Sequence, residues 1–471
     1  MAAFKCAPMV LGQLLKRPPG PEFADALAKI GGISIADTRW REGQHLELLP
    51  MIQTAAEAKT VDSREYVFAM LPLSKPSKRL EGTGRSVAPL TIDYSLTTEQ
   101  VFQEAAKFII DERQDLLLWW AERPPVGRKI FNMPSWVPDW TSKLPGGIAG
   151  PIKLSCEAQP SLRQWSDSIQ PQKRITIEDN KLHLQAHKLD RIQTISRLFT
   201  YDNCRKLLVE QWKALPWGPS ETTDKKAERF WRTIVLNVGG ETNSPSTQAP
   251  PPRSLTASFL SIVAEERVLE LLGCTMEQLG TDEAIRERAR THPECKAIGH
   301  QCGKGEAFEV LMRKNAIGRR FFTTESGGLG MTAFEEVNST LKAARDALQA
   351  QAADTQGFGG MMMSSFQNFL KERDPAGAEA YAKAMGETED ERGAKVGDVI
   401  VAAVGGFHPY VLRQAGEDAE SSTDSLRGKE FTYIGDCYLH GVMKGEPFAA
   451  TNWLGRQSWR TDITVEDIRI V

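Results

Sequence analysis

The sequence predicts an α+β fold in which a helical N-terminal region precedes an antiparallel, β-rich C-terminal region with a barrel-like or sandwich-like form. In the first third of the chain, apolar residues recur at spacings of three and four, the period of one helical face. The stretches 318–330, 396–413 and 431–441 are instead rich in β-branched and aromatic residues. A helical pattern fills residues 331–395, so we expect a long helical insertion that interrupts the sheet.

Three regions are expected, because a chain of 471 residues exceeds what one hydrophobic core supports. Residues 1–145 form a helical region that ends near a Pro-Ser-Trp-Val-Pro-Asp-Trp segment. Residues 146–315 combine a β-hairpin with helices, and they contain a low-complexity loop at 239–253 that we expect to be disordered. Residues 316–471 form the β-rich region that carries the insertion 331–395.

Two helices of the N-terminal region have recognisable starts. Residues 62–73 are expected to form one compact helix with Asp62 as its N-cap. Thr97 and Gln100 have the spacing of a capping box. The helix that follows this box has an apolar stripe of Val101, Ala105, Phe108 and Ile109.

The middle of the chain alternates between extended and helical patterns. Residues 133–140 contain two prolines, which exclude a helix and a central strand and predict an extended segment held by its two tryptophans. Residues 174–177 and 181–186 flank a Glu-Asp-Asn turn, which favours a β-hairpin. Helical patterns return in 203–238 and 254–290.

Charge and hydropathy exclude several classes of function. The net charge of −3 gives no electrostatic basis for binding nucleic acid or an anionic membrane. Apolar stretches fall short of the about 18 residues that a spanning helix needs, so no membrane span is expected. The seven cysteines are scattered and odd in number, which indicates reduced thiols and a cytoplasmic location.

Several short motifs occur in the order in which fungal heterokaryon-incompatibility (HET) proteins carry them. They are Asp62–Leu71, Asp93–Ser95, Met133–Trp140, Phe230–Thr233, Gly318–Thr324, Gly397–Asp398, Pro409–Arg413 and Gly435–Glu446. The chain thus resembles the region that follows the effector domain of this family, and the motifs of the effector domain itself have no counterpart. The resemblance implies an allorecognition or regulatory protein that binds a protein partner, while the missing effector motifs argue against a death-inducing role.

Motifs for a cofactor, a metal or a catalytic nucleophile are incomplete. The segment 327–330 lacks the spacing of a phosphate loop, so a tight turn is the better interpretation. Segment 292–302 contains two histidines and two cysteines in an unfamiliar spacing for zinc, and we favour solvated loop residues. His183 and His187 share one strand face, where half-buried hairpin positions explain them at least as well as metal chelation. Cys437 has no adjacent base. We therefore expect no cofactor and no metal.

Four polar residues are the candidates for catalysis. Arg319, Arg320 and Arg413 are the best cations on the β framework, with a salt bridge or an exposed face as the alternative, and the first two are the catalytic candidates among them. His408 and Tyr410 flank Pro409 at a strand entry and could donate hydrogen bonds to a carbonyl. The residues expected to contact an apolar substrate are Trp136, Trp140, Phe321, Phe358, Met361, Met362 and Phe366.

The remaining chemistry needs only shape, desolvation and a few hydrogen bonds. We expect a cofactor-independent cyclase or isomerase of fungal secondary metabolism that acts on an apolar terpenoid or polyketide. An intramolecular Diels–Alder reaction that forms a norbornene is one such reaction. The insertion 331–395 would act as a lid, unless its methionines simply dock it onto the body. The alternative function is a non-enzymatic HET-like protein that binds a protein partner through the C-terminal β region.

Overall fold

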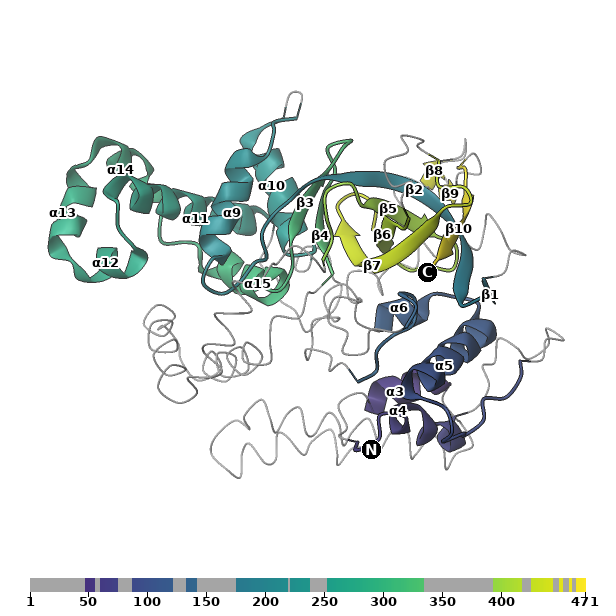
Figure 1. The fold of residues 1–471 in the computed structure, drawn as a ribbon. Coiled ribbons are helices and arrows are strands. Elements are labelled where there is room, and N and C mark those ends of the chain that lie inside the picture. The colour runs from purple at the N-terminus through teal and green to yellow at the C-terminus, as the bar shows by residue number, and fades with distance from the viewer. Residues whose placement is uncertain are drawn as a thin grey trace.

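The protein is described here by a computed structural model that has an α+β fold (Figure 1). A ring-shaped β-sheet lies between an N-terminal group of helices and a second helical body. The structure describes residues 47–55, 60–74, 87–121, 133–141, 175–218, 221–237, 252–333, 393–416, 425–443, 449–451, 457–459 and 463–471.

The sheet closes on itself as an antiparallel ring. Its strands, in the order in which they pair, are β2 (Lys181–Ile195), β3 (Phe321–Thr324), β4 (Leu329–Thr332), β7 (Glu430–Leu439), β6 (Pro409–Gln414) and β5 (Val399–Ala403). β5 then pairs with β2 again, which closes the ring. The structure therefore confirms the predicted antiparallel β region and gives it the barrel-like form. The ring also contains β2, which belongs to the region predicted over residues 146–315.

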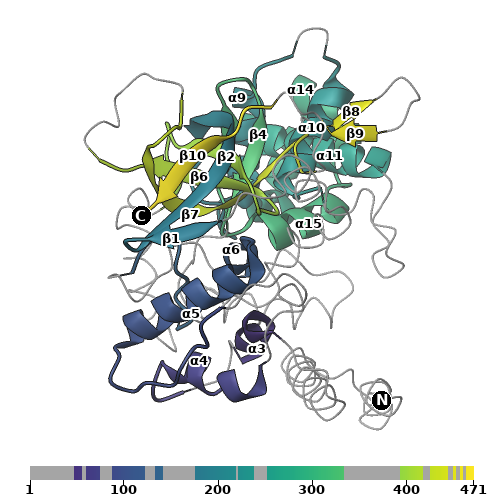
Figure 2. The ribbon, with the colours of Figure 1, turned by 90° about the vertical axis from the view of Figure 1, so that its right-hand side faces the viewer.

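Two further strands extend the ring at one end (Figure 2). β1 (Thr176–Glu178) forms the predicted hairpin with β2, and the turn is made by Asp179 and Asn180 at positive φ of 49° and 61°. β10 (Glu466–Ile470) runs antiparallel to β2 and makes a short parallel contact with β7. A separate hairpin joins β8 (Ala449–Thr451) to β9 (Gln457–Trp459).

The insertion begins later than the sequence predicts. β4 occupies 329–332, where it pairs with both β3 and β7, so the long connection to β5 starts after Thr332. The Thr332 hydroxyl accepts the Arg320 N–H at 2.9 Å, which fixes the end of this strand. The central part of the insertion, 334–392, lies outside the described residues, as does most of the predicted loop 239–253.

The N-terminal helices are α3 (Leu48–Ala55), α4 (Glu65–Phe68), η1 (Leu71–Leu73), α5 (Thr98–Arg113) and α6 (Leu117–Ala121). The single helix expected over 62–73 is wrong. α4 ends at Phe68 and the short 3₁₀ turn η1 follows, because Pro72 has no N–H to continue the α-helical hydrogen bonds. The Asp62 carboxylate binds Arg64 and is not the N-cap of α4. The capping box of Thr97 and Gln100 at α5 is confirmed.

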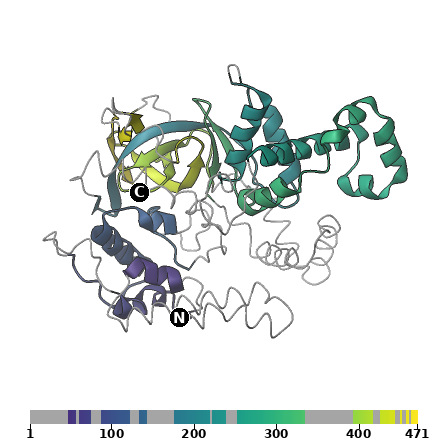
Figure 3. The ribbon, with the colours of Figure 1, turned by 180° about the vertical axis from the view of Figure 1, so that it is seen from behind.

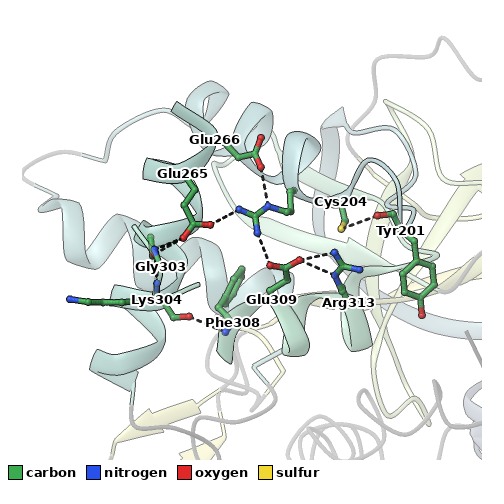
Figure 4. A network of polar contacts seen from close by, with 12 residues as sticks. Tyr201, Cys204, Glu265, Glu266, Gly303, Lys304, Phe308, Glu309 and Arg313 are labelled. Atoms are coloured by element: carbon green, nitrogen blue, oxygen red, sulfur yellow. Dashed lines mark hydrogen bonds and ion pairs between the residues drawn. The ribbon is translucent and has the colours of Figure 1, made fainter. Parts of the chain in front are cut away.

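The second helical body contains α9 (Cys204–Ala214), α10 (Thr223–Ile234), α11 (Pro252–Leu272) and α15 (Glu306–Ala316). An arm projects from it away from the ring (Figure 1), made of α12 (Met276–Thr281), α13 (Glu283–Thr291), α14 (Pro293–Ile298) and η3 (Gly299–Gln301). Arg205 on α9 joins three elements of the body. It donates to Glu265 and Glu266 on α11 and to Glu309 on α15, at 2.6, 2.9 and 2.6 Å (Figure 4).

Apolar side chains pack on both sides of the ring wall, as strand alternation requires. The interior holds Ile192, Phe322, Ile400, Val411, Ile434, Cys437 and Leu439. One outer core joins the N-terminal helices to Val399, Val401, Tyr410, Leu412, Phe431 and Tyr433. A second outer core joins the helical body to Phe321, Leu329, Met331 and Tyr438. The two helical parts thus cover different stretches of the outer wall (Figure 3).

Candidate active site

The turn between β5 and β6 places two of the predicted catalytic residues. Gly405 has a φ of +86°, and an added side chain on Gly406 would come within 2.6 Å of the Tyr410 ring, so the turn lies tightly against that ring. The Phe407 N–H donates to the Tyr410 hydroxyl at 3.1 Å. The sequence before Pro409 therefore folds back over Tyr410 and holds His408 beside it.

Asp436 on β7 lies directly opposite Tyr410 in the β6–β7 ladder. The register shifts between Val411 and Leu412, because Ile434 is an extra residue on β7 next to Gly435. Directly opposed residues of an antiparallel pair place their side chains on the same face. Asp436 and Tyr410 therefore share the outer face of the ring wall.

Two further groups converge on the Asp436 carboxylate. Nδ1 of His408 lies 3.7 Å from Oδ2 of Asp436. Arg319 lies close enough that its charge lowers the pKa of Asp436, while the Asp436 charge raises the pKa of Arg319. The Arg319 guanidinium is held in place by donating from Nη1 to the Thr332 carbonyl at 2.9 Å. The structure thus brings three of the four predicted catalytic residues together around a carboxylate.

Burial controls the ionisation of this cluster, which comprises Arg319, His408, Tyr410 and Asp436. Burial raises the pKa of Asp436 to about 6, against the opposing effect of the Arg319 charge. Burial likewise lowers the pKa of Arg319 to about 10 and that of His408 to about 3, and it raises the pKa of Tyr410. At pH 7 the cluster therefore contains a guanidinium cation, a carboxylate, a neutral imidazole and a neutral phenol.

The cluster sits at the boundary between the two outer cores. Along the outer face of β7, Phe431 and Tyr433 belong to the first core and Tyr438 to the second, with Asp436 between them. Trp119 on α6 stacks on Tyr433 at 4.2 Å and meets the Tyr410 ring edge-on at 5.1 Å. An aromatic wall therefore lines the side of the cluster that faces the N-terminal helices.

The other predicted site residues lie elsewhere. Arg320 is buried next to β4, and its Nη1 donates to the Ser196 carbonyl at 3.4 Å. Trp136 and Trp140 are buried in the first outer core, where the Trp136 indole donates to the Asn180 carbonyl at 2.9 Å. Phe321 packs in the second outer core. The predicted substrate contacts Phe358, Met361, Met362 and Phe366 lie outside the described residues.

Arg413, Gly327 and Cys437 have structural roles in the sheet. Arg413 forms two hydrogen bonds with Asp398, at 2.9 and 2.8 Å, at the base of the β5–β6 hairpin. Gly327 has a φ of +86° in the turn between β3 and β4, which confirms the tight turn. Burial raises the pKa of the Cys437 thiol well above its ordinary value, so a thiolate nucleophile is disfavoured there.

Within the described ranges, no group of three or more His, Cys, Asp or Glu side chains could hold a metal ion. The helices of the described part of the chain lack the combination of length and apolar character that a membrane crossing requires.

Asp436 belongs to the candidate site, although the sequence does not predict it there. It is the one carboxylate within the apolar and aromatic run Phe431–Leu439, which was interpreted only as a strand. A charged residue in the middle of such a run indicates that a polar or charged partner lies nearby, because burial of a charge requires a partner. Its partners come from residues 319 and 408–410, which are remote in sequence.

Comparison with known proteins gives no match: no family model, no curated protein and no solved structure matches the chain. The resemblance to HET proteins therefore stays a prediction that rests on the motifs.

Proposed function

We propose that the chain is a cofactor-independent cyclase that acts on an apolar terpenoid or polyketide, with the Asp436 cluster as its polar centre. The observation that carries the proposal is the convergence of Arg319, His408 and Tyr410 on Asp436 at a buried place in the ring wall. Ionisable groups with strongly shifted pKa values that gather in one place are more frequent at functional sites than elsewhere.

The roles of the groups follow from their ionisation. Arg319 stays cationic at pH 7, and its guanidinium would donate to a substrate carbonyl. Asp436 would hold this cation in place as its counter-charge. The Tyr410 hydroxyl would act as a second donor, while the neutral His408 adds no charge that would attract water. Hydrogen bonds in such a desolvated place polarise a carbonyl more strongly than they do in water.

An intramolecular Diels–Alder reaction fits this set of groups. Two carbon–carbon bonds form at the expense of two π bonds, no atom is lost, and no electron or proton is supplied from outside. Acceleration then requires a folded substrate conformer and a polarised dienophile carbonyl. The aromatic wall of Trp119 and Tyr433 would pack against the apolar chain of the substrate.

The test compares two tyrosines that are equally buried. The substrate probe is a linear polyene that carries a diene and a conjugated aldehyde, incubated with the purified chain and a metal chelator. Tyr410→Phe is expected to lower the rate of cyclisation roughly tenfold, since it removes a donor to the carbonyl. Tyr438→Phe, on the same outer face but in the second core, is expected to keep the wild-type rate.

The product is measured by chromatography and mass spectrometry against a reaction without protein, and circular dichroism confirms that each variant is folded. If the wild-type chain accelerates no cyclisation over the protein-free reaction, the cyclase proposal fails and the HET-like protein-binding function becomes the better one. Equal rates for both tyrosine variants would remove the cluster from the mechanism.

A further inference from the structure

A second site lies on the three-stranded sheet that β1, β2 and β10 form at the end of the ring (Figure 2). One face of this sheet carries Leu182, Leu184, Ile468 and Ile470, which are buried in the first outer core. On the opposite face, Thr176, His183 and Arg469 form one cross-strand row, and Gln185 and Asp467 form the next. The register therefore gathers five polar side chains on a single surface.

This surface is hollowed rather than flat. A cavity of about 340 Å³ lies over it, and its lining includes all five polar residues together with Gly428. The volume is at the small end of the range for ligand pockets, and it suits a single ring-sized molecule. The cavity shares no residue with the Asp436 cluster, so a ligand bound there would be independent of the proposed cyclase activity.

Gln185 shows that the surface is not simply the solvated face of an amphipathic sheet. A polar residue on such a face is normally exposed, whereas Gln185 is only 8% exposed. Its Oε1 atom is buried and accepts no hydrogen bond from the described residues. Native proteins leave few buried amide oxygens in this condition. A ligand with a hydroxyl or N–H group in the cavity would supply the donor that this oxygen lacks.

The charges around the cavity are balanced. The Arg469 guanidinium donates to the Gly428 carbonyl at 2.6 Å and lies 3.5 Å from the Glu430 carboxylate. Lys181 binds the same carboxylate at 2.6 Å. The cation that lines the cavity is thus already compensated, and Asp467 adds a negative charge. This environment offers little attraction to a free carboxylate or phosphate.

We propose that this cavity binds a small, neutral, polyhydroxylated molecule such as a sugar ring. A sugar hydroxyl both donates and accepts hydrogen bonds, and the lining provides both kinds of partner. Arg469, His183 and Thr176 would donate to ligand oxygens, while Asp467 and the Gln185 carbonyl would accept from ligand hydroxyls. Such a mixed lining discriminates against ligands that can only accept or only donate.

The test measures binding of four neutral polyols to the full chain: methyl α-D-glucopyranoside, methyl α-D-mannopyranoside, methyl β-D-galactopyranoside and myo-inositol. Saturation-transfer NMR detects binding, and calorimetry gives the affinity. Saturable binding of at least one polyol is expected, together with weaker binding of acetate and inorganic phosphate. Gln185→Leu is expected to weaken the best polyol about tenfold, because it removes one ligand hydrogen bond.

Gln193→Leu is the matched control, since Gln193 is exposed on the same strand and lies outside the cavity lining. It should leave the affinity unchanged. Asp467→Asn, at an exposed position of β10, is the second test variant and should also weaken binding about tenfold if Gln185→Leu does not fold. The proposal is overturned if no polyol binds saturably, if acetate or phosphate binds more tightly, or if the folded test variants bind as the wild type does.

Discussion

Arg319 and Asp436 come from distant parts of the chain, and their charges partly offset the effect of burial on each other. Burial lowers the pKa of Arg319 to about 10 and raises that of Asp436 to about 6, while the charge of each residue opposes the shift of the other. The pair is therefore ionised at neutral pH in a place where a single charge would be costly.

The first prediction concerns the pH dependence of stability. The folded-state pKa of Asp436, about 6, is above its ordinary value of 3.8, so the folded chain binds this proton more tightly than the unfolded chain does. The contribution of Asp436 to the free energy of unfolding should therefore fall as pH rises from about 4 to about 6, by roughly 3 kcal/mol.

Asp436→Asn removes this titration and is the reference for the measurement. Urea denaturation of both proteins between pH 4 and pH 7 gives the difference in their free energies of unfolding. The titration of Asp436 should shift this difference toward the wild type as pH falls toward 4. Because the raised pKa already includes the attraction of Arg319, the neutral side chain of the variant should make it the more stable protein at pH 7, and the two stabilities should converge near pH 4. A difference that is constant over this pH range would contradict the shifted pKa.

The second prediction concerns the Arg205 network. Burial by itself would lower the pKa of Arg205, but Glu309, Glu265 and Glu266 outweigh it, and the pKa ends above its ordinary value. Arg205→Met leaves these carboxylates close together without their cation, so the free energy of unfolding should fall by about 3 kcal/mol. Arg197→Met is the control, because its pair with Glu210 is exposed and should contribute under about 1 kcal/mol. Urea denaturation measures the free energy of unfolding of both variants.

The third prediction concerns Trp119, which joins α6 to the ring. Its ring plane lies at 12° to that of Tyr433, and its Nε1–H donates to the Trp136 carbonyl at 3.0 Å. Trp119→Phe loses this hydrogen bond and part of the stacked area, so the expected loss of stability is about 2 kcal/mol. Trp217→Phe is the comparison, since Trp217 is 57% exposed, and should change the stability by less than about 1 kcal/mol.

The fourth prediction concerns a glycine in β4. A Cβ atom on Gly330 would lie 2.1 Å from the Phe322 ring and 2.6 Å from the Tyr438 carbonyl. Gly330→Ala should therefore force the ring wall apart and cost about 3 kcal/mol or more. Gly280→Ala, in α12, meets nothing within 4 Å and should be neutral or slightly stabilising. Thermal unfolding of the two variants gives the comparison, and similar melting temperatures would refute the close approach.

The parts of the fold that the sequence predicted are those that depend on local patterns. The capping box at Thr97 and the hairpin turn at Asp179 and Asn180 depend on neighbouring side chains and backbone preferences, and the structure contains both. The helix expected over 62–73 is divided for a local reason too, because Pro72 cannot continue the hydrogen bonds of α4. The start of the insertion was misplaced because Thr332 pairs with Cys437 on a strand far along the chain.

The candidate site was predictable only in part, because its residues meet through strand pairing between segments that are remote in sequence. Arg319, His408 and Tyr410 are noticeable as polar residues at strand entries, but their meeting point depends on how the ring closes. Asp436 faces the same side as Tyr410 because a bulge at Ile434 resets the alternation of β7. The alternation of an unbroken strand would instead place Asp436 on the inner face of the ring, with Ile434.

The closure of the ring has a consequence for the order of folding. β2 pairs with β5 through Ala186 and Ala403, which closes the ring, and with β10 through Ala186 and Glu466, so both ladders join segments remote in the chain. Contacts of such high sequence separation form slowly, because the intervening chain must be ordered or spanned first. In a pulsed hydrogen-exchange experiment, we expect the amides of α9 to α11 to be protected before those of the β2–β5 ladder.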